Sequence, residues 1–117
     1  MILRSWRGYA SADEPDRYPH HLLEKVRPKL ERVPGFLGLY LPQRTQATEI
    51  EYCVQTLWES MEAIRAFAGP APDEAVVEPQ AAAMLKRYDR WVVHYEILSA
   101  PRVRVRPRIT GGLSHNV

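Results

Sequence analysis

Two side chains near the start of the sequence could act on a bound molecule, one as a base and one as a cation. His21 carries an imidazole whose ordinary pKa, about 6.5, lets it take up a proton near neutral pH. Arg4 carries a permanent positive charge that could stabilise an anion in a dry pocket. We therefore predict His21 and Arg4 as catalytic residues. The structural alternatives are that His21 lies on the flank of a helix and that Arg4 pairs with a helix carboxylate.

Aromatic side chains could form the walls of such a pocket. We predict that four of them bind the substrate: Trp6, Tyr18, Tyr52 and Trp91. Aromatic residues in a small sheet also fill hydrophobic cores, so packing is their alternative role. His94 has the opposite strand parity to Trp91, and we expect it at an interface between two copies of the chain.

Other site chemistry is not indicated. The histidines and Glu24 show no metal-ligand spacing, and Cys53 is the single cysteine. The sequence contains no glycine-rich phosphate loop, and neither Ser60 nor Ser99 lies in a nucleophile-elbow context. We therefore expect no metal ion and no cofactor.

The first strand and first helix must position these residues. Residues 2–9 read as a strand with Arg4 and Trp6 on one face. Apolar residues then recur every four positions along a helix: Tyr18, Leu22, Val26 and Leu30. Pro28 removes one backbone hydrogen bond and predicts a kink or break near residues 24–26.

The rest of the chain predicts three more strands and one more helix. Pro34-Gly35 ends the first helix, and residues 36–43 and 49–58 form a hairpin around a turn at 44–48. Ser60 caps a helix that stops at Gly69. A connector follows, with helical turns possible at 73–77 and 81–88, and residues 90–98 form the last strand. This β-α-β-β-α-β order predicts an α+β, ferredoxin-like fold with a four-stranded antiparallel sheet.

Two helices can cover only one face of that sheet. The other face would expose an apolar patch: Leu37, Leu39, Leu41, Cys53, Leu57 and Val92. Such patches usually mark interfaces, so we expect a homodimer that closes sheet against sheet.

Composition predicts one domain, residues 1–98, and a basic tail, residues 99–117. The tail carries four of the 16 basic residues and no acid, which leaves 12 basic against 14 acidic residues elsewhere. We therefore do not expect a nucleic-acid surface on the domain. The tail is either flexible or an extra edge strand that crosses to a partner. The sequence has no signal-like start and no membrane-length apolar run, and its single cysteine indicates a reducing cytoplasm.

Three segments resemble the antibiotic biosynthesis monooxygenase (ABM) superfamily, the dimeric α/β barrels, and one uncharacterised monooxygenase-like subset of it. Residues 33–40, VPGFLGLY, are similar to its "PGF-x-G" turn, and residues 94–98, HYEIL, resemble a closing strand. Residues 57–69, LWESMEAIRAFAG, match its "W-x-S-x-E-A-(I/F)-xx-F" helix pattern most specifically. Together the resemblance spans residues 1–98.

The resemblance implies a cofactor-independent monooxygenase, or a related isomerase or decarboxylase. Its substrate would be a small aromatic or polyketide-like molecule held between sheet and helices. Haem-degrading members place a histidine about ten residues after a helix-two aromatic and an asparagine on strand one. Val77 stands at the first place and residues 2–9 lack asparagine, so we expect no haem.

The alternative is a non-catalytic ligand-binding or interaction module of the same fold. An enzyme should have a closed pocket of at least about 300 Å³ that holds two or more polar groups. Filling of that space by Trp6, Tyr52 and Trp91 would favour the non-catalytic alternative.

Overall fold

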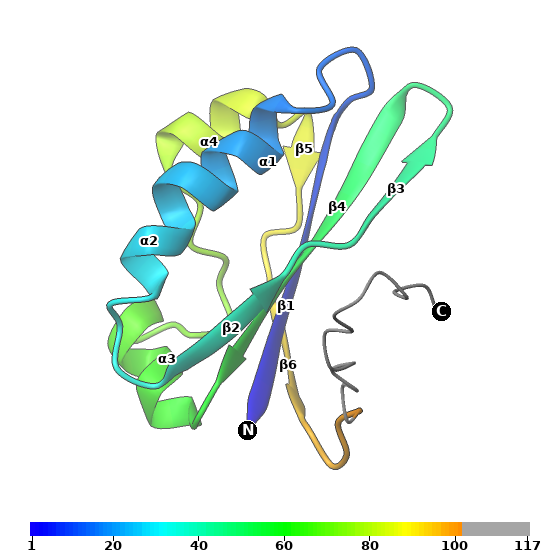
Figure 1. The fold of residues 1–117 in the computed structure, drawn as a ribbon. Helices are drawn as coiled ribbons and strands as arrows, with labels where there is room; N and C mark the ends of the chain where they lie inside the picture. The colour runs from blue at the N-terminus through cyan, green and yellow to red at the C-terminus, as the bar shows by residue number, and fades with distance from the viewer. Residues whose placement is uncertain (102–117) are drawn as a thin grey trace, which may run out of the picture.

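Antiparallel strand pairing organises the chain, whose computed structural model describes residues 1–101 (Figure 1). The long strands β1 (Ile2–Ser11) and β4 (Glu49–Trp58) pair along their whole length at the centre of the sheet. On the outer side of β4 lie β2 (Phe36–Tyr40) and β3 (Gln43–Gln46), and on the outer side of β1 lie β5 (Arg87–Tyr88) and β6 (Val93–Glu96). Each outer side is one interrupted strand, so the predicted split β-α-β-β-α-β sheet is confirmed.

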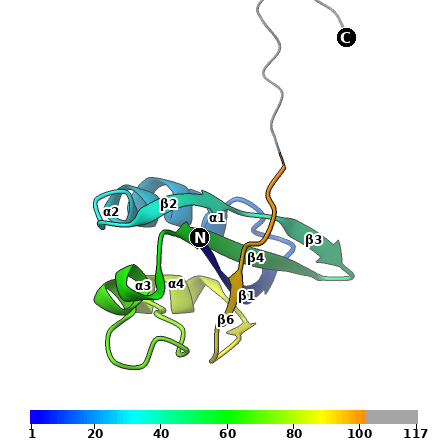
Figure 2. The ribbon, with the colours of Figure 1, turned by 90° about the horizontal axis from the view of Figure 1, so that it is seen from below.

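The helices lie on one face of this sheet (Figure 2). α1 (Arg17–His21), the π-helical turn η1 (Leu22–Val26) and α2 (Arg27–Leu30) follow one another without a gap. α3 (Met61–Ala68) shares a core cluster with α2 through Ile64 and Leu30, and α4 (Pro79–Met84) packs beside α1. None of the helices within residues 1–101 is long and apolar enough to cross a membrane.

The π-helical turn is the break predicted from Pro28. Proline has no N–H to donate to the carbonyl four residues earlier, so the regular helical ladder cannot continue there. The Arg27 N–H instead bonds the carbonyl of Leu22, five residues back. A turn of this kind holds one extra residue and is often found at functional sites.

The "PGF" turn and the second helix are locked together around Trp58. The Trp58 side chain is fully buried, meets Phe36 edge-on at 5.3 Å and stacks on Phe67 at 5.2 Å. Ser60 caps α3, as predicted, because its hydroxyl accepts the Ala63 N–H at 3.2 Å. Gly35 has a φ of +88°. These contacts give the residues of the family-like motif a structural role.

Several predicted boundaries are wrong. β3 occupies most of the predicted turn at 44–48 and leaves a tight turn in which Ala47 has a φ of 51°. Residues 73–77 are not helical, because Glu74 forms a β-bridge with Trp91. The later helix lies at Pro79–Met84 rather than 81–88, and the last strand begins only at Val93.

The face assignment of the last strand is also wrong. His94 on β6 pairs directly with Arg4 on the neighbouring strand β1. Because cross-strand partners share a face of the sheet, His94 lies on the helix-covered side. Val92 is buried there too. Trp91, which was expected in the pocket or core, is 54% exposed, and Tyr95 on β6 is 52% exposed.

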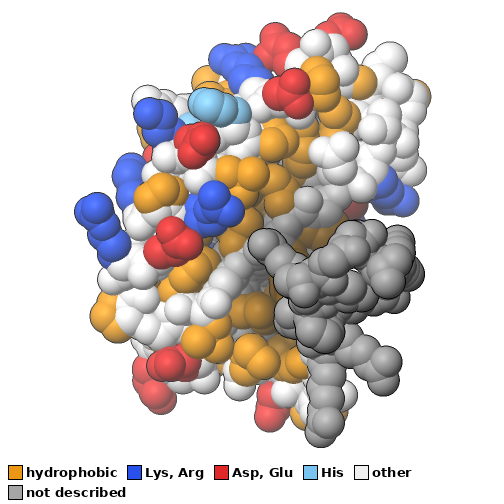
Figure 3. Space-filling model, viewed as in Figure 1, with side chains coloured by type: hydrophobic (Ala, Val, Ile, Leu, Met, Phe, Trp, Pro, Cys, Tyr) orange, Lys and Arg blue, Asp and Glu red, His pale blue; other side chains and the backbone are white. Residues whose placement is uncertain are grey.

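The helix-free face carries the apolar patch, with different members. Leu37 is exposed, as expected, whereas Cys53 and Leu57 are half-buried, and Leu39 and Leu41 pack against the core. The residues that we call the open-face patch are Leu3, Leu37, Cys53, Leu57, Val93 and Tyr95; strand pairing places five of them on this face, and Leu37 is the exposed residue at the bulge between Phe36 and Gly38. In the view of Figure 3, hydrophobic side chains gather through the middle of the molecule and charged ones lie mostly at its margin. The arginine-rich segment 102–117 lies outside the described residues.

Candidate functional site

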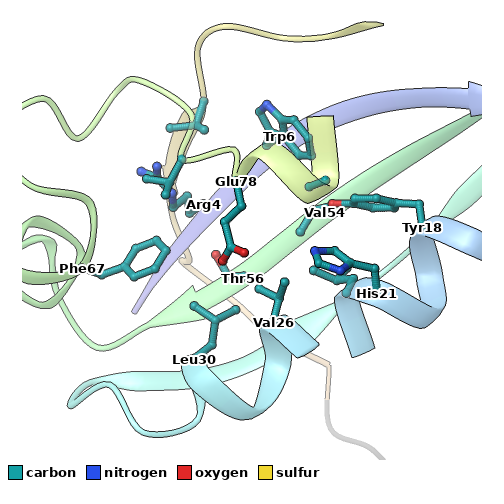
Figure 4. Close-up of a pocket in the computed structure, with 14 residues that line it drawn as sticks. Arg4, Trp6, Tyr18, His21, Val26, Leu30, Val54, Thr56, Phe67 and Glu78 are labelled. Atoms are coloured by element: carbon teal, nitrogen blue, oxygen red, sulfur yellow. The ribbon is translucent and has the colours of Figure 1, made fainter. Parts of the chain in front are cut away.

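A cavity of about 100 Å³ lies between the helix-covered face of the sheet and the segment α1–η1–α2 (Figure 4). Most of its wall is apolar, including Leu22, Val26, Leu30, Val54, Ala81 and Val92. Its aromatic walls are Trp6, Tyr18 and Phe67. The cavity is smaller than the 300 Å³ expected for an enzyme pocket.

His21 brings a polar atom into this apolar space. The side chain is only 4% exposed, and its Nε2 is buried without a hydrogen-bond partner among the described residues. Figure 4 shows the ring pointing from α1 toward the cavity. Leaving a buried polar atom unpaired costs about 1–3 kcal/mol, so a bound hydroxyl that paired with Nε2 would be favoured.

Tyr18 lies one turn before His21 and points its hydroxyl into the same space (Figure 4). Burial raises the pKa of the Tyr18 hydroxyl well above its ordinary value of 10, and the neighbouring Tyr52 hydroxyl raises it further. Tyr18 is therefore neutral near pH 7 and can donate or accept a hydrogen bond. Tyr52 packs against the Tyr18 ring at 5.2 Å and donates to the Pro15 carbonyl at 2.9 Å, so it supports Tyr18 from behind rather than lining the cavity.

Arg4 forms the polar end of the cavity that lies opposite His21, and its side chain is 5% exposed. Its Nη1 donates to the Pro72 carbonyl and to His94 Nε2 (2.9 Å), and its Nη2 donates to the Glu74 carbonyl (3.1 Å). The predicted alternative, an ion pair with a helix carboxylate, is therefore wrong. The three bonds use three of the five guanidinium N–H groups, which leaves two for a ligand as far as residues 1–101 are concerned.

His94 holds Arg4 in place and was not predicted at the site. Burial lowers the pKa of His94 below 6.5, the neighbouring Arg4 charge lowers it further, and Asp73 opposes both effects. The ring is therefore neutral near pH 7. Because Nε2 accepts from Arg4, Nδ1 carries the proton and faces Asp73 Oδ1 at 3.3 Å. This chain of contacts joins β6, β1 and the connector.

The connector, residues 69–78, supplies the mouth of the cavity. Val76 lines it and is 53% exposed, and Glu78 points its carboxylate into it beside Thr56 (Figure 4). Glu78 also lies 4.0 Å from Lys29 on α2. Sequence reasoning missed both residues, because an irregular segment has no periodicity from which a direction can be inferred.

The structure thus brings together four of the six predicted site residues: Arg4, Trp6, Tyr18 and His21. Tyr52 lies behind the wall, and Trp91 lies away from the cavity on the surface. Trp6 is fixed by a hydrogen bond from its Nε1 to the Asp89 carbonyl at 2.7 Å. No group of three or more potential ligands within the described part of the chain could hold a metal ion.

Known proteins resemble this chain in structure but not detectably in sequence. No family model matches the sequence, and no curated protein matches it. Among solved structures, the haem degrader MhuD from Mycobacterium tuberculosis, determined with two haems bound in its active site, aligns with a TM-score of 0.60 at 22% identity, over 87% of this chain and 100% of that one.

Two further structures agree. A putative antibiotic biosynthesis monooxygenase from Bacillus cereus aligns at 0.60 and 15% identity, over 90% and 98% of the chains. The monooxygenase ActVA-Orf6 of Streptomyces coelicolor, in complex with nanaomycin D, aligns at 0.53 and 17% identity, over 92% of each chain. The chain therefore shares the fold of these proteins, as the sequence motifs predicted.

Proposed function

We propose that this chain is a monooxygenase-like member of the ABM superfamily that acts, without a cofactor, on a small electron-rich phenol. The observation that carries the proposal is the unpartnered Nε2 of His21, buried against an apolar cavity. A neutral imidazole in that position can accept the phenolic proton, and general-base assistance typically contributes a factor of about 10²–10⁴.

The two ends of the cavity have complementary roles in this proposal. His21 takes the proton, and the Arg4 guanidinium stabilises the negative charge that forms in a site of low dielectric. Trp6 and Phe67 provide flat surfaces for the ring. The phenolate then transfers electrons to O₂: a ring C–H and the O–H bond break, one oxygen atom bonds to the ring to give a quinone, and the other leaves with both hydrogens as water.

The volume of the cavity limits the substrate in this conformation. An engineered cavity of about 150 Å³ in another protein takes up benzene, so about 100 Å³ suits one ring rather than several. In this conformation the cavity does not fit haem, because its volume is far below the range of about 300–1,000 Å³ found even for drug-sized ligands. We therefore derive no step through haem.

The same small volume favours the second candidate, a module that binds a small ligand without turning it over. In that case Arg4 serves mainly to fasten the connector, since three of its donors are already engaged. The cavity is smaller than the volume expected for an enzyme, which favours the binding module. Tyr52 and Trp91 do not fill it, however, which favours the enzyme.

Oxygen uptake separates them. The purified protein is mixed with a panel of single-ring hydroquinones and with anthrones, and uptake is compared for wild type, His21→Ala and the control variant Arg65→Ala at an exposed position on α3. The enzyme hypothesis expects uptake by wild type and Arg65→Ala, and a drop of about 10²-fold or more for His21→Ala. Binding of a hydroquinone without uptake by wild type would favour the non-catalytic module.

The homodimer belongs to the same proposal. The open-face patch is apolar, lies on the face without helices and includes exposed Leu37, Val93 and Tyr95. A second copy that packs sheet against sheet would bury it. We also keep the cytoplasm as the expected location and the division into a domain, residues 1–98, and a basic tail.

A further inference from the structure

His21 lines a second cavity in addition to the interior one. A surface groove of about 620 Å³ runs between α1 and α4, the two helices that lie side by side in Figure 1. Its walls come from Arg17, His20, His21 and Lys25 on one side and from Ala83 and Met84 on the other. The His21 imidazole is thus shared between the groove and the interior cavity.

We propose that His21 is a gate: when its side chain turns aside, the interior cavity and the groove join into one site for a phenol of two or more rings that carries an acidic group, and the imidazole, now beside the bound ligand, serves as the base for the phenolic proton from that position. This inference rests on the proposed function and names a larger substrate class for the same site. The interior cavity alone is too small for such a ligand, whereas the groove is within the range of about 300–1,000 Å³ for ligand sites.

Two features leave His21 able to turn. No hydrogen bond to the rest of residues 1–101 holds its Nε2, so turning gives up no bond there and exposes the atom to water or ligand. The residue also directly precedes η1, where the Arg27 N–H reaches back five residues to Leu22. Such π turns often occur at functional sites.

The chemistry of the groove indicates which ligand would extend into it. Arg17 and Lys25 supply positive charge, and Asp16 lines the same groove. Arg17 also pairs with Glu14 at 3.1 Å, but both side chains are at least half exposed, and such pairs are weak. Ala83 and Met84 offer an apolar wall for a second ring. An acidic substituent would therefore lie toward Arg17 and Lys25, with the phenolic end in the interior.

The test uses two probes and three variants of the full chain. Phenol fits the interior cavity alone, and 6-hydroxy-2-naphthoate has a second ring with a carboxylate at its far end. Ala83→Trp fills the groove, and His21→Ala removes the gate. Ala66→Trp is the matched control, because Ala66 is also an exposed alanine on a helix, but on α3 away from the groove. Affinities are measured by calorimetry and association rates by stopped-flow fluorescence.

We expect wild type and Ala66→Trp to bind both probes. Ala83→Trp should keep its affinity for phenol and lose about tenfold or more for the naphthoate, about 1.4 kcal/mol or more. His21→Ala should bind the naphthoate with an association rate at least about fivefold faster, because the opening step is gone.

The gate is refuted if Ala83→Trp binds the naphthoate as tightly as wild type does, or if wild type binds phenol but not the naphthoate. Should His21→Ala fail to fold, the Ala83→Trp comparison decides alone. If wild type binds neither probe, the proposed function fails together with the gate, whereas phenol binding without the groove effect removes only the gate.

Discussion

Arg4 on β1 and His94 on β6 are direct cross-strand partners, and the guanidinium Nη1 of one donates to the imidazole Nε2 of the other at 2.9 Å. Together with the Pro72 and Glu74 carbonyls, this contact fastens the connector to the sheet. The mouth of the cavity therefore depends on a residue that the sequence presented mainly as a candidate for catalysis.

Replacing Arg4 should loosen the connector. Arg4→Met keeps much of the apolar stem but leaves the Pro72 and Glu74 carbonyls and His94 Nε2 without their donors. Because a hydrogen bond to a charged group contributes about 1.5–3 kcal/mol, we expect the free energy of unfolding to fall by about 3 kcal/mol or more. Urea unfolding measures this loss, and limited proteolysis should find faster cleavage within residues 69–78. Unchanged stability and cleavage would contradict the fastening role.

His94 should make stability depend on pH below neutrality. Its pKa in the folded protein lies below the unfolded value of about 6.5, because of burial and Arg4, with Asp73 opposing them. The unfolded chain therefore binds more protons in that window, so stability is fully present above pH 6.5 and declines as the pH falls toward the lowered pKa.

Urea midpoints between pH 7.5 and 5 measure the effect. His94→Gln, which keeps an acceptor for Arg4 but cannot titrate, should show a shallower slope over this range than wild type, whereas His20→Gln, at an exposed position, should keep the wild-type slope. Equal slopes for His94→Gln and wild type would exclude His94 as the source.

Replacing His21 should separate stability from activity. His21→Leu removes a buried nitrogen that has no partner within residues 1–101, so we expect a free energy of unfolding equal to wild type or higher by up to about 1–2 kcal/mol, while turnover of phenols is lost. Thermal unfolding and oxygen uptake measure the two effects. A loss of more than about 2 kcal/mol would show that the imidazole has a structural role instead.

Gly35 and Gly38 form a matched pair on the "PGF-x-G" segment. A Cβ on Gly35 would lie 2.5 Å from the Ala63 Cβ, and the φ of +88° disfavours any side chain there, so Gly35→Ala should cost about 2–4 kcal/mol. A Cβ on Gly38 meets no atom within 4 Å, and its φ is not in the left-handed range, so Gly38→Ala should change stability by less than about 1 kcal/mol. Chemical denaturation compares them, and similar losses in both would contradict the contact.

A charge on the open-face patch should break the proposed dimer. Leu57→Glu places a carboxylate at the centre of the patch, opposite Leu3 on β1, where a second copy would bury it unpaired. Light scattering should give two chains for wild type and one for Leu57→Glu. Leu98→Glu, at a position that is 90% exposed, should remain a dimer. A monomeric wild type at micromolar concentration would refute the sheet-to-sheet assembly.

The sequence predicts best those features that are set by neighbours along the chain. Pro28 predicts the break that becomes η1, and Ser60 predicts the start of α3, because a missing N–H and a capping hydroxyl act within one helical turn. The alternation in residues 2–9 correctly places Arg4 and Trp6 on the face that lines the cavity.

Features that depend on pairing between distant parts of the chain could not be predicted from local sequence patterns. Alternation divides residues 90–98 into two sets but does not say which set faces the helices, and that depends on the pairing of His94 with Arg4. The exposed Trp91 follows from the same pairing and from the late start of β6. Val76 and Glu78 lie in an irregular connector, so only coordinates could place them at the cavity.

The hydrogen bond from Arg4 to the Pro72 carbonyl joins residues 68 positions apart, and this separation has a consequence for how the site is assembled. Closing so long a loop carries an entropic cost that must be met before the contact contributes, so such contacts tend to form late in folding. During synthesis, β1 leaves the ribosome long before the segment that will cap it. The sheet centre and first helix can therefore be in place while the binding chamber is still open, and the chamber takes its final shape only when the last third of the domain has been made.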